Sequence, residues 1–206
     1  KRSRGVRFLM KKNKSDVSMG FGKLKGSGKL EVKDAEGKTQ TVEAKHIIVA
    51  TGGRSRELPS LKQDGKKVIG YREAMALPQQ PKSMIVVGSG AIGVEFGYFY
   101  NSMGTKVTIV EFLDRVVPVE DEEISKELAK NFKKNGIEIL TSSEVTSVDT
   151  GGNGVKAKVK TKEGEVTLEA DVLLSAVGVA ANIEGIGLEE TGVKTDKGRI
   201  SVDKFY

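Results

Sequence analysis

An apolar strand that runs directly into a glycine pattern constrains the fold of this chain more than any other feature. Residues 84–87 are all apolar, and GSGAIG at 88–93 fits the pattern G-x-G-x-x-G. A helix is expected over 90–103, with Gly104 ending it. The chain holds 25 glycines, so chance matches to the glycine pattern are easy, and the strand–turn–helix context is what gives it weight.

The same alternation continues after the first helix. A β-branched strand is expected at 106–111, a second helix at 121–135 with acids at its start and lysines at its end, and a third strand at 137–141. Strands that alternate with helices through short loops predict an α/β fold with a parallel, Rossmann-like doubly wound sheet. Three further strands between 145 and 168 alternate like an antiparallel β-meander, and 172–177 is predicted to return as a buried strand.

Before the glycine pattern, short strands separated by glycines and turns are expected between residues 17 and 43. His46–Ala50 (HIIVA) is a continuous apolar run followed by Thr51, Gly52 and Gly53. It predicts a buried strand that delivers a glycine turn. His46 is interpreted as the residue that starts this strand.

The composition excludes several kinds of chemical site. No cysteine and a single histidine are present, so we expect no disulfide framework, redox dithiol or metal site. No run approaches the roughly 20 apolar residues of a membrane span, and no signal peptide is recognised, so a cytoplasmic protein without membrane contact is expected. Residues 1–38 carry 12 basic and 4 acidic side chains, but Phe8 is the only aromatic among the first 14, which favours a solvated helix face over a nucleic-acid site.

The glycine pattern predicts a dinucleotide site in which each residue has a physical role. Gly88 permits the tight turn, Gly90 lets backbone amides approach a pyrophosphate, and Gly93 lets the helix pack closely on the strand. The helix N-terminus supplies free N–H groups to the phosphates. Glu111, about 20 residues on at the end of the next strand, can accept hydrogen bonds from the adenosine ribose and would repel a 2′-phosphate, which favours NAD over NADP. The alternative is that Glu111 ends its strand facing water.

GSGAIGVEFG, with HIIVATGG before it and LLSAVGVAAN after it, resembles the flavin-dependent disulfide oxidoreductases, and among them the dihydrolipoamide dehydrogenases. The resemblance runs from about Ser18 to Asp203. It implies three segments: a partial FAD domain at 1–75, an NAD-binding domain at 76–180 and a return segment toward the FAD domain at 181–206. It also implies that the whole enzyme is a homodimer that passes electrons from dihydrolipoamide through a redox disulfide and FAD to NAD, with the lipoyl domain of 2-oxoacid dehydrogenase complexes as its partner.

The resemblance also assigns residues. Glu95 would reach the nicotinamide carboxamide and Ile92 would cover the nicotinamide pocket, although from helix phasing alone Glu95 is equally an ordinary exposed helix residue. Arg56 stands where many relatives have proline, which is expected to loosen that turn. The NAD contacts implied are Gly88, Ser89, Gly90, Ala91, Ile92, Gly93, Val94, Glu95, Glu111, Val145 and Gly178. The FAD contacts implied are Thr51, Gly52, Gly53 and Gly22.

No catalytic residue is expected within these 206 residues, because the cysteine pair and the acid–base histidine of the family would lie elsewhere. The chain alone is therefore expected to be inactive. Two alternatives stay open at this point. One is the NAD-binding part of a relative of the glutathione reductase, mercuric reductase or NADH oxidase type. The other is a stand-alone NAD-binding or redox-sensing module without catalysis.

Overall fold

The computed structural model describes residues 2–205, and its contacts divide the chain into two units. The central unit is Arg54–Ala180. The discontinuous unit combines the residues up to Gly53 with those from Ala181 on. Each unit has its own hydrophobic core.

The first unit boundary lies earlier than the expected one at 75/76. The connector before the glycine pattern belongs to the central unit, because Leu61 and Val68 are buried in its core and Val68–Ile69 pairs with the parallel sheet. Short, polar and Pro-containing segments give little local signal for such packing. The second boundary of the two units falls between Ala180 and Ala181.

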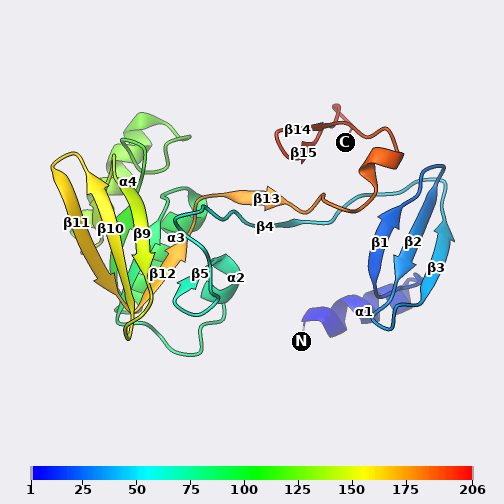
Figure 1. Cartoon of the computed structure of the whole chain (residues 1–206), viewed down its shortest axis with the longest axis horizontal. Coiled ribbons are helices and arrows are strands. Elements are labelled where there is room, and N and C mark those ends of the chain that lie inside the picture. Colours follow the sequence, from blue (N-terminus) through cyan, green and yellow to red (C-terminus); the bar gives the residue numbers. More distant parts are fainter. Residues whose placement is uncertain (1, 206) are drawn as a thin grey trace. The chain divides into compact units, whose positions relative to one another are not determined.

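A five-stranded parallel sheet forms the middle of the central unit, in the order β5-β12-β6-β7-β8. Figure 1 labels two of its strands, β5 and β12, and the three meander strands β9, β10 and β11. The last pairs of its ladders bring the carboxyl ends of the strands to one edge: Val87 lies opposite both Ser175 and Val110, and Val110 lies opposite Leu140. The strands are β5 (Val68–Ile69), β6 (Ser83–Val87), β7 (Lys106–Val110), β8 (Glu138–Leu140) and β12 (Val172–Ser175).

Different layers cover the two faces of this sheet. Helices α2, α3 and α4 pack on one face, where Ala74, Tyr100 and Phe132 join the apolar side chains of the strands. The antiparallel meander covers the other face, where Val155 and Val159 meet the strands instead. The predicted α/β fold with a parallel sheet and a meander is confirmed, and the structure adds that each takes one face. The elements are α2 (Tyr71–Ala74), α3 (Ala91–Ser102), α4 (Glu122–Lys134), β9 (Glu144–Asp149), β10 (Val155–Thr161) and β11 (Gly164–Ala170).

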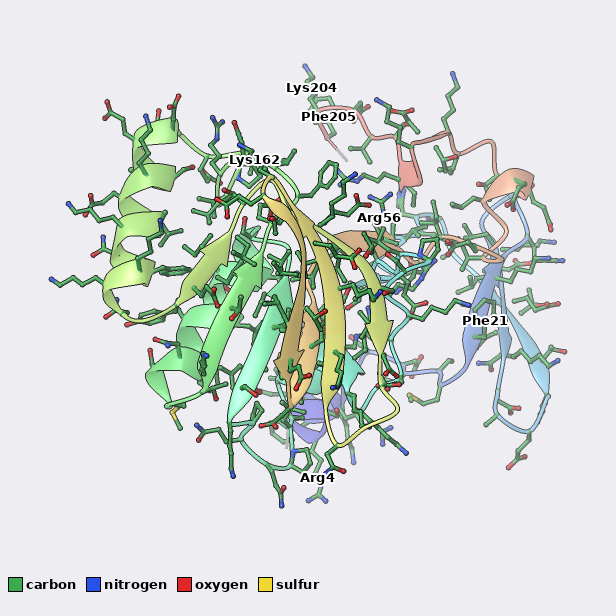
Figure 2. The ribbon with its side chains drawn as sticks, turned by 60° about the vertical axis from the view of Figure 1, so that its left-hand side comes forward. Arg4, Phe21, Arg56, Lys162, Lys204 and Phe205 are labelled. Carbon is green, nitrogen blue, oxygen red and sulfur yellow. The ribbon has the colours of Figure 1, made fainter. Side chains whose placement is uncertain are left out.

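The meander follows the period of two that its sequence predicts. Along β10, Val155, Ala157 and Val159 are buried while the lysines between them are exposed. Figure 2 shows Lys162 at the tip of the β10–β11 hairpin. Lys156 pairs with Glu169 across the exposed face, at 2.7 Å.

The discontinuous unit contains a three-stranded antiparallel sheet, β1-β2-β3, and a small core in which Leu24, Ile186 and Leu188 are buried. Residues far apart in sequence thus share one core. Its elements are α1 (Arg2–Lys12), β1 (Phe21–Leu24), β2 (Lys29–Lys33), β3 (Thr39–Glu43), a 3₁₀ turn η1 (Leu188–Glu190), β14 (Thr195–Asp196) and β15 (Arg199–Ile200). The connecting strands β4 (Gly53–Ser55) and β13 (Val179–Ala181) pair with each other where the chain passes between the units.

The predicted buried strand at His46–Ala50 is wrong. These residues are not in a strand, and Ile48 is 90% exposed. Val49 alone of the run packs partly against the core of the discontinuous unit. An apolar run becomes a buried strand only where other strands flank it, and none pairs with this run within residues 2–205. His46 is therefore an exposed residue of an irregular segment and does not start a strand.

No helix in the described part of the chain is both long and apolar enough to traverse a lipid bilayer.

Candidate nucleotide-binding site

A cleft of about 720 Å³ opens at the carboxyl edge of the parallel sheet, within the central unit. This is where open α/β sheets place their ligands, and the volume is in the usual range for small-molecule sites. Hydrogen bonds prolong the strand ladder into its floor: Gly88 N–H donates to Val110 O (2.8 Å), and Ala176 N–H donates to Val87 O (2.8 Å). The floor of the cleft is therefore continuous with the buried strands β6, β7 and β12.

The glycine loop has the geometry that its sequence predicts. Gly88 adopts φ +96°, in the region that favours glycine, and a Cβ there would come within 2.5 Å of Ala176 O. A Cβ on Gly93 would overlap the carbonyl oxygen of Gly88, so the helix can approach the loop this closely only with glycine. A Cβ on Gly90 would meet no atom within 4 Å, so its backbone faces open space.

Helix α3 begins at this loop with Gly90 as its N-cap residue. The first intrahelical hydrogen bond runs from Val94 N–H to Gly90 O (3.0 Å). Helix geometry leaves the amides of Ala91, Ile92 and Gly93 without a partner inside the helix. The arrangement offers an anion three N–H groups and the positive end of the helix dipole.

Glu111 comes directly after β7, and its side chain is only 7% exposed. Its Oε2 accepts hydrogen bonds from Ser89 N–H and Ser89 Oγ–H, both at 2.7 Å, and its Oε1 accepts one from Leu113 N–H (2.8 Å). A carboxylate has about four lone-pair positions, so about one remains for a ligand. The alternative in which Glu111 ends its strand facing water is therefore wrong: the carboxylate is buried and clamps the glycine loop.

The cleft brings six of the predicted NAD contacts together: Gly88, Ser89, Gly90, Glu111, Val145 and Gly178. The other five lie along the first turns of α3. Of these, Ile92 and Val94 pack partly against the helix-side core, whereas Ala91 and Glu95 are exposed. Glu95 is exposed, as expected if it is an ordinary residue on the surface of the helix. Its contact with the nicotinamide carboxamide stays a prediction.

The residues predicted to contact FAD lie in the discontinuous unit. Gly22 is in β1, and Thr51, Gly52 and Gly53 precede and begin β4. Asn182 fastens this turn, since its N–H donates to Gly52 O (2.9 Å) and its Nδ2 donates to Thr51 O (3.1 Å). Gly52 adopts φ +72°, and a Cβ there would meet nothing within 4 Å. The turn is thus a fixed backbone loop with an open face.

The cleft also contains residues that the sequence did not single out. Phe112 and Leu113 follow Glu111 directly, so their position after a strand end was available as a signal. Leu58 and Leu61 come from the connector, where nothing local indicates a cleft. Arg56 was expected to loosen its turn, but its N–H donates to Gly178 O (3.0 Å), a bond that proline could not make.

Groups of three or more His, Cys, Asp or Glu side chains that could hold a metal ion are absent among residues 2–205. Of the two carboxylates that line the cleft, Glu111 is held in place by hydrogen bonds from Ser89 and Leu113.

The central unit has a glycine loop at a helix N-terminus, at the carboxyl edge of a parallel sheet and beside a buried strand-end acid, which is the arrangement found in dinucleotide-binding α/β folds. The comparisons make the assignment specific. Residues 1–206 match the family described as "Pyridine nucleotide-disulphide oxidoreductase". This chain belongs to that family.

Curated relatives support the same assignment. Dihydrolipoyl dehydrogenase of Zymomonas mobilis is 45% identical over 202 residues, which cover 98% of this chain and 43% of that protein. The Rhizobium etli dihydrolipoyl dehydrogenase is 46% identical over 217 residues, covering 98% of this chain and 45% of the relative. The chain thus spans less than half the length of these relatives.

Solved structures share the fold. LpdA from Mycobacterium tuberculosis superposes with a TM-score of 0.85 at 31% identity, over 96% of this chain and 44% of that chain. The HOCl-induced flavoprotein disulfide reductase RclA from Escherichia coli, as its Cu(II) complex, gives a TM-score of 0.81 at 25% identity, over 98% and 47% of the two chains.

Proposed function

We propose that the central unit binds NAD along the cleft. The pyrophosphate would lie against the glycine loop and the free amides of α3, the adenosine ribose near Glu111, and the nicotinamide toward Gly178. The observation that carries the proposal is the buried Glu111 carboxylate, which is fixed on the loop by Ser89 and keeps about one acceptor position open. The open backbone at Gly90 fits a pyrophosphate approaching the same loop.

The preference for NAD over NADP follows from the electrostatics of Glu111. A ribose hydroxyl can donate to its remaining lone pair, whereas a 2′-phosphate would bring negative charge against a carboxylate that is shielded from water. Such repulsion is screened little in a buried site. Discrimination against NADP is therefore the expected signature of this acid.

The wider proposal is that the chain is the NAD-binding portion of a dihydrolipoyl dehydrogenase. The whole enzyme would oxidise dihydrolipoamide of a lipoyl domain through a redox disulfide, with FAD and NAD supplying the electron and hydride chemistry. Identity of 45–46% to two dihydrolipoyl dehydrogenases supports this. Thr51, Gly52, Gly53 and Gly22 of the discontinuous unit would contact FAD, with the open face at Gly52 as the structural support.

A second candidate is the corresponding portion of another disulfide reductase. The structural likeness to RclA, which is described as a flavoprotein disulfide reductase, favours it. Both candidates share the NAD cleft and differ in the disulfide they reduce or oxidise. The lower identity to RclA, 25%, makes this the weaker of the two.

The 206 residues contain no cysteine, so they cannot by themselves form a redox disulfide. We expect the purified chain to show no reduction of NAD by dihydrolipoamide, measured as absorbance at the NADH band, while still binding the nucleotide. Turnover by the chain alone would contradict the proposal that its role is binding and orientation.

The test of NAD binding is a pair of calorimetric titrations, with NAD and with NADP. Replacing Glu111 by alanine would leave the Ser89 and Leu113 donors without a partner. Glu111→Gln keeps the volume, removes the charge and keeps one acceptor oxygen, so it disturbs the loop less, although its NH2 group cannot accept from the donors on one side. NAD affinity is expected to fall roughly tenfold to a hundredfold, for a charged hydrogen bond of about 1.5–3 kcal/mol. NADP should lose less or gain.

The matched control is Glu163→Gln, the same chemical change at an exposed position in the β10–β11 turn. It should leave both affinities unchanged. If the NADP-to-NAD affinity ratio does not move in Glu111→Gln, the acid does not read the ribose. If the unaltered chain binds neither nucleotide, the proposed function fails.

A further inference from the structure

The cleft has an unusual charge balance for a site proposed to hold a dinucleotide. Its charged lining residues are Glu111, Glu144 and Arg56. A pyrophosphate brings two negative charges, and two of the three lining charges have the same sign. Helix α3 contributes only a partial positive charge of about one half. Arg56 is thus the one cationic side chain among the described residues that line the cleft.

The backbone of Arg56 is fixed at the cleft. Its N–H donates to Gly178 O (3.0 Å), and Gly178 follows β12 by three residues at φ +111°. Ala176, two residues before Gly178, lies against the glycine loop, where its oxygen would meet a Cβ on Gly88. Two residues of extended chain span about 7 Å. Arg56 is therefore anchored close to the loop, on its β12 side.

The side chain of Arg56 is available to a ligand. It is exposed, and within residues 2–205 its guanidinium has no hydrogen bond or ion pair. Arg56 directly follows the connecting strand β4, and Figure 2 labels its side chain. An arginine that is held at the backbone but free at the guanidinium can reach an anion in the cleft without breaking an existing contact.

We propose that Arg56 binds the pyrophosphate of the dinucleotide, at the phosphate on the nicotinamide side. This rests on the proposed NAD function of the cleft and adds a binding residue to it. The planar guanidinium matches a phosphate with two parallel N–H donors and stays charged at any working pH. Arg56 lies on the β12 side of the loop, near Gly178, whereas Glu111 follows β7, so the two residues would contact different parts of the dinucleotide. The positive charge of Arg56 would also offset the negative charges of the two carboxylates that the anion must approach.

The test uses the full 206-residue chain and three ligands: NADH, ADP-ribose and AMP. ADP-ribose keeps the pyrophosphate without the nicotinamide, and AMP keeps only the adenosine-side phosphate. Arg56→Ala should weaken NADH and ADP-ribose about tenfold and leave AMP unchanged, since charged hydrogen bonds are strong but this side chain is partly screened by water. Arg56→Lys should recover part of the loss, because the charge remains and the paired donors do not.

Lys62→Ala is the matched control: it removes one positive charge from an exposed position in the same connector, outside the cleft lining. It should leave all three affinities unchanged. Equal affinities for NADH and ADP-ribose in Arg56→Ala and Lys62→Ala would overturn the proposal, as would an equal loss for AMP. If the unaltered chain bound none of the three ligands, both this proposal and the NAD function would be wrong. If Arg56→Ala weakens binding of NADH and ADP-ribose while the unaltered chain and Lys62→Ala bind both normally, the result supports the role of Arg56 separately from the NAD function.

Discussion

Two apolar runs of similar length, each followed by glycines, end in opposite environments. Met84–Val87 becomes β6, fully buried, and delivers the glycine loop of the cleft. His46–Ala50 is not in a strand and is exposed except for a partly buried Val49, although the turn that follows it is held by Asn182. In sequence both predict a buried strand.

The difference lies in what flanks each run. Strand β6 has β12 on one side and β7 on the other, with α3 over one face and the meander over the other, so Met84–Val87 is buried. No strand pairs with His46–Ala50 within residues 2–205. An apolar run is therefore buried as a strand only where the tertiary structure supplies neighbouring strands and covering layers.

The largest expected effect separates the two runs directly. Ile85→Ala removes a side chain that is 1% exposed between two covered faces, and should cost about 2–5 kcal/mol of unfolding free energy. Ile48→Ala changes a side chain that is 90% exposed, and should lie within about 0.5 kcal/mol of the unaltered chain. Urea unfolding followed by circular dichroism measures both. A large loss for Ile48→Ala would mean that this run is buried in solution.

The next effect separates two glycines of one loop. Gly93→Ala should destabilise the central unit by about 1–3 kcal/mol, because its Cβ would overlap Gly88 O and shift α3 from the sheet. Gly90→Ala has open space and an ordinary φ of −68°, so stability should be kept while NAD affinity falls. Thermal unfolding and NAD titration of both variants check this. Gly90→Ala with unchanged affinity would show that the loop backbone is not approached by the pyrophosphate.

The smallest effect concerns the connector. Burial would raise the pKa of Asp64, but hydrogen bonds from the amides of Lys66, Val68 and Lys67 outweigh it and lower that pKa below its usual 3.8. A lowered pKa in the folded state stabilises at pH above 3.8, and that contribution is lost as pH falls through the folded value.

Asp64→Asn, which keeps the acceptor oxygen but cannot titrate, should therefore lose less stability than the unaltered chain between pH 6 and pH 3. Urea midpoints at the two pH values measure this. Asp34→Asn is the matched control, an Asp in a comparable turn of the other unit that accepts from Glu36 and Lys38 amides. If Asp64→Asn followed the unaltered chain, the connector would not contribute to the acid sensitivity of the central unit.

The sequence by itself determined most of the central unit. The order of strands and helices, the glycine loop and the acid after β7 are local patterns, because the period of an amphipathic segment and the spacing of the glycines extend over a few residues. The contact that requires glycine at Gly88 is with the distant Ala176 O. The meander was predicted from its alternation for the same reason. Glu111 could be singled out as a candidate because its spacing from the loop is set by one strand–helix–strand unit.

Only tertiary structure decided the rest. Several features of the cleft depend on segments distant in sequence that meet at one sheet edge. They are the burial of Glu111 and its hydrogen bonds with Ser89, the position of Leu58 and Leu61 in the cleft lining, and the hydrogen bond from Arg56 to Gly178. Ile48 is exposed because no distant segment packs over it within residues 2–205. A residue's type fixes what it must bury or pair with, but whether a partner is present is a property of the folded chain as a whole.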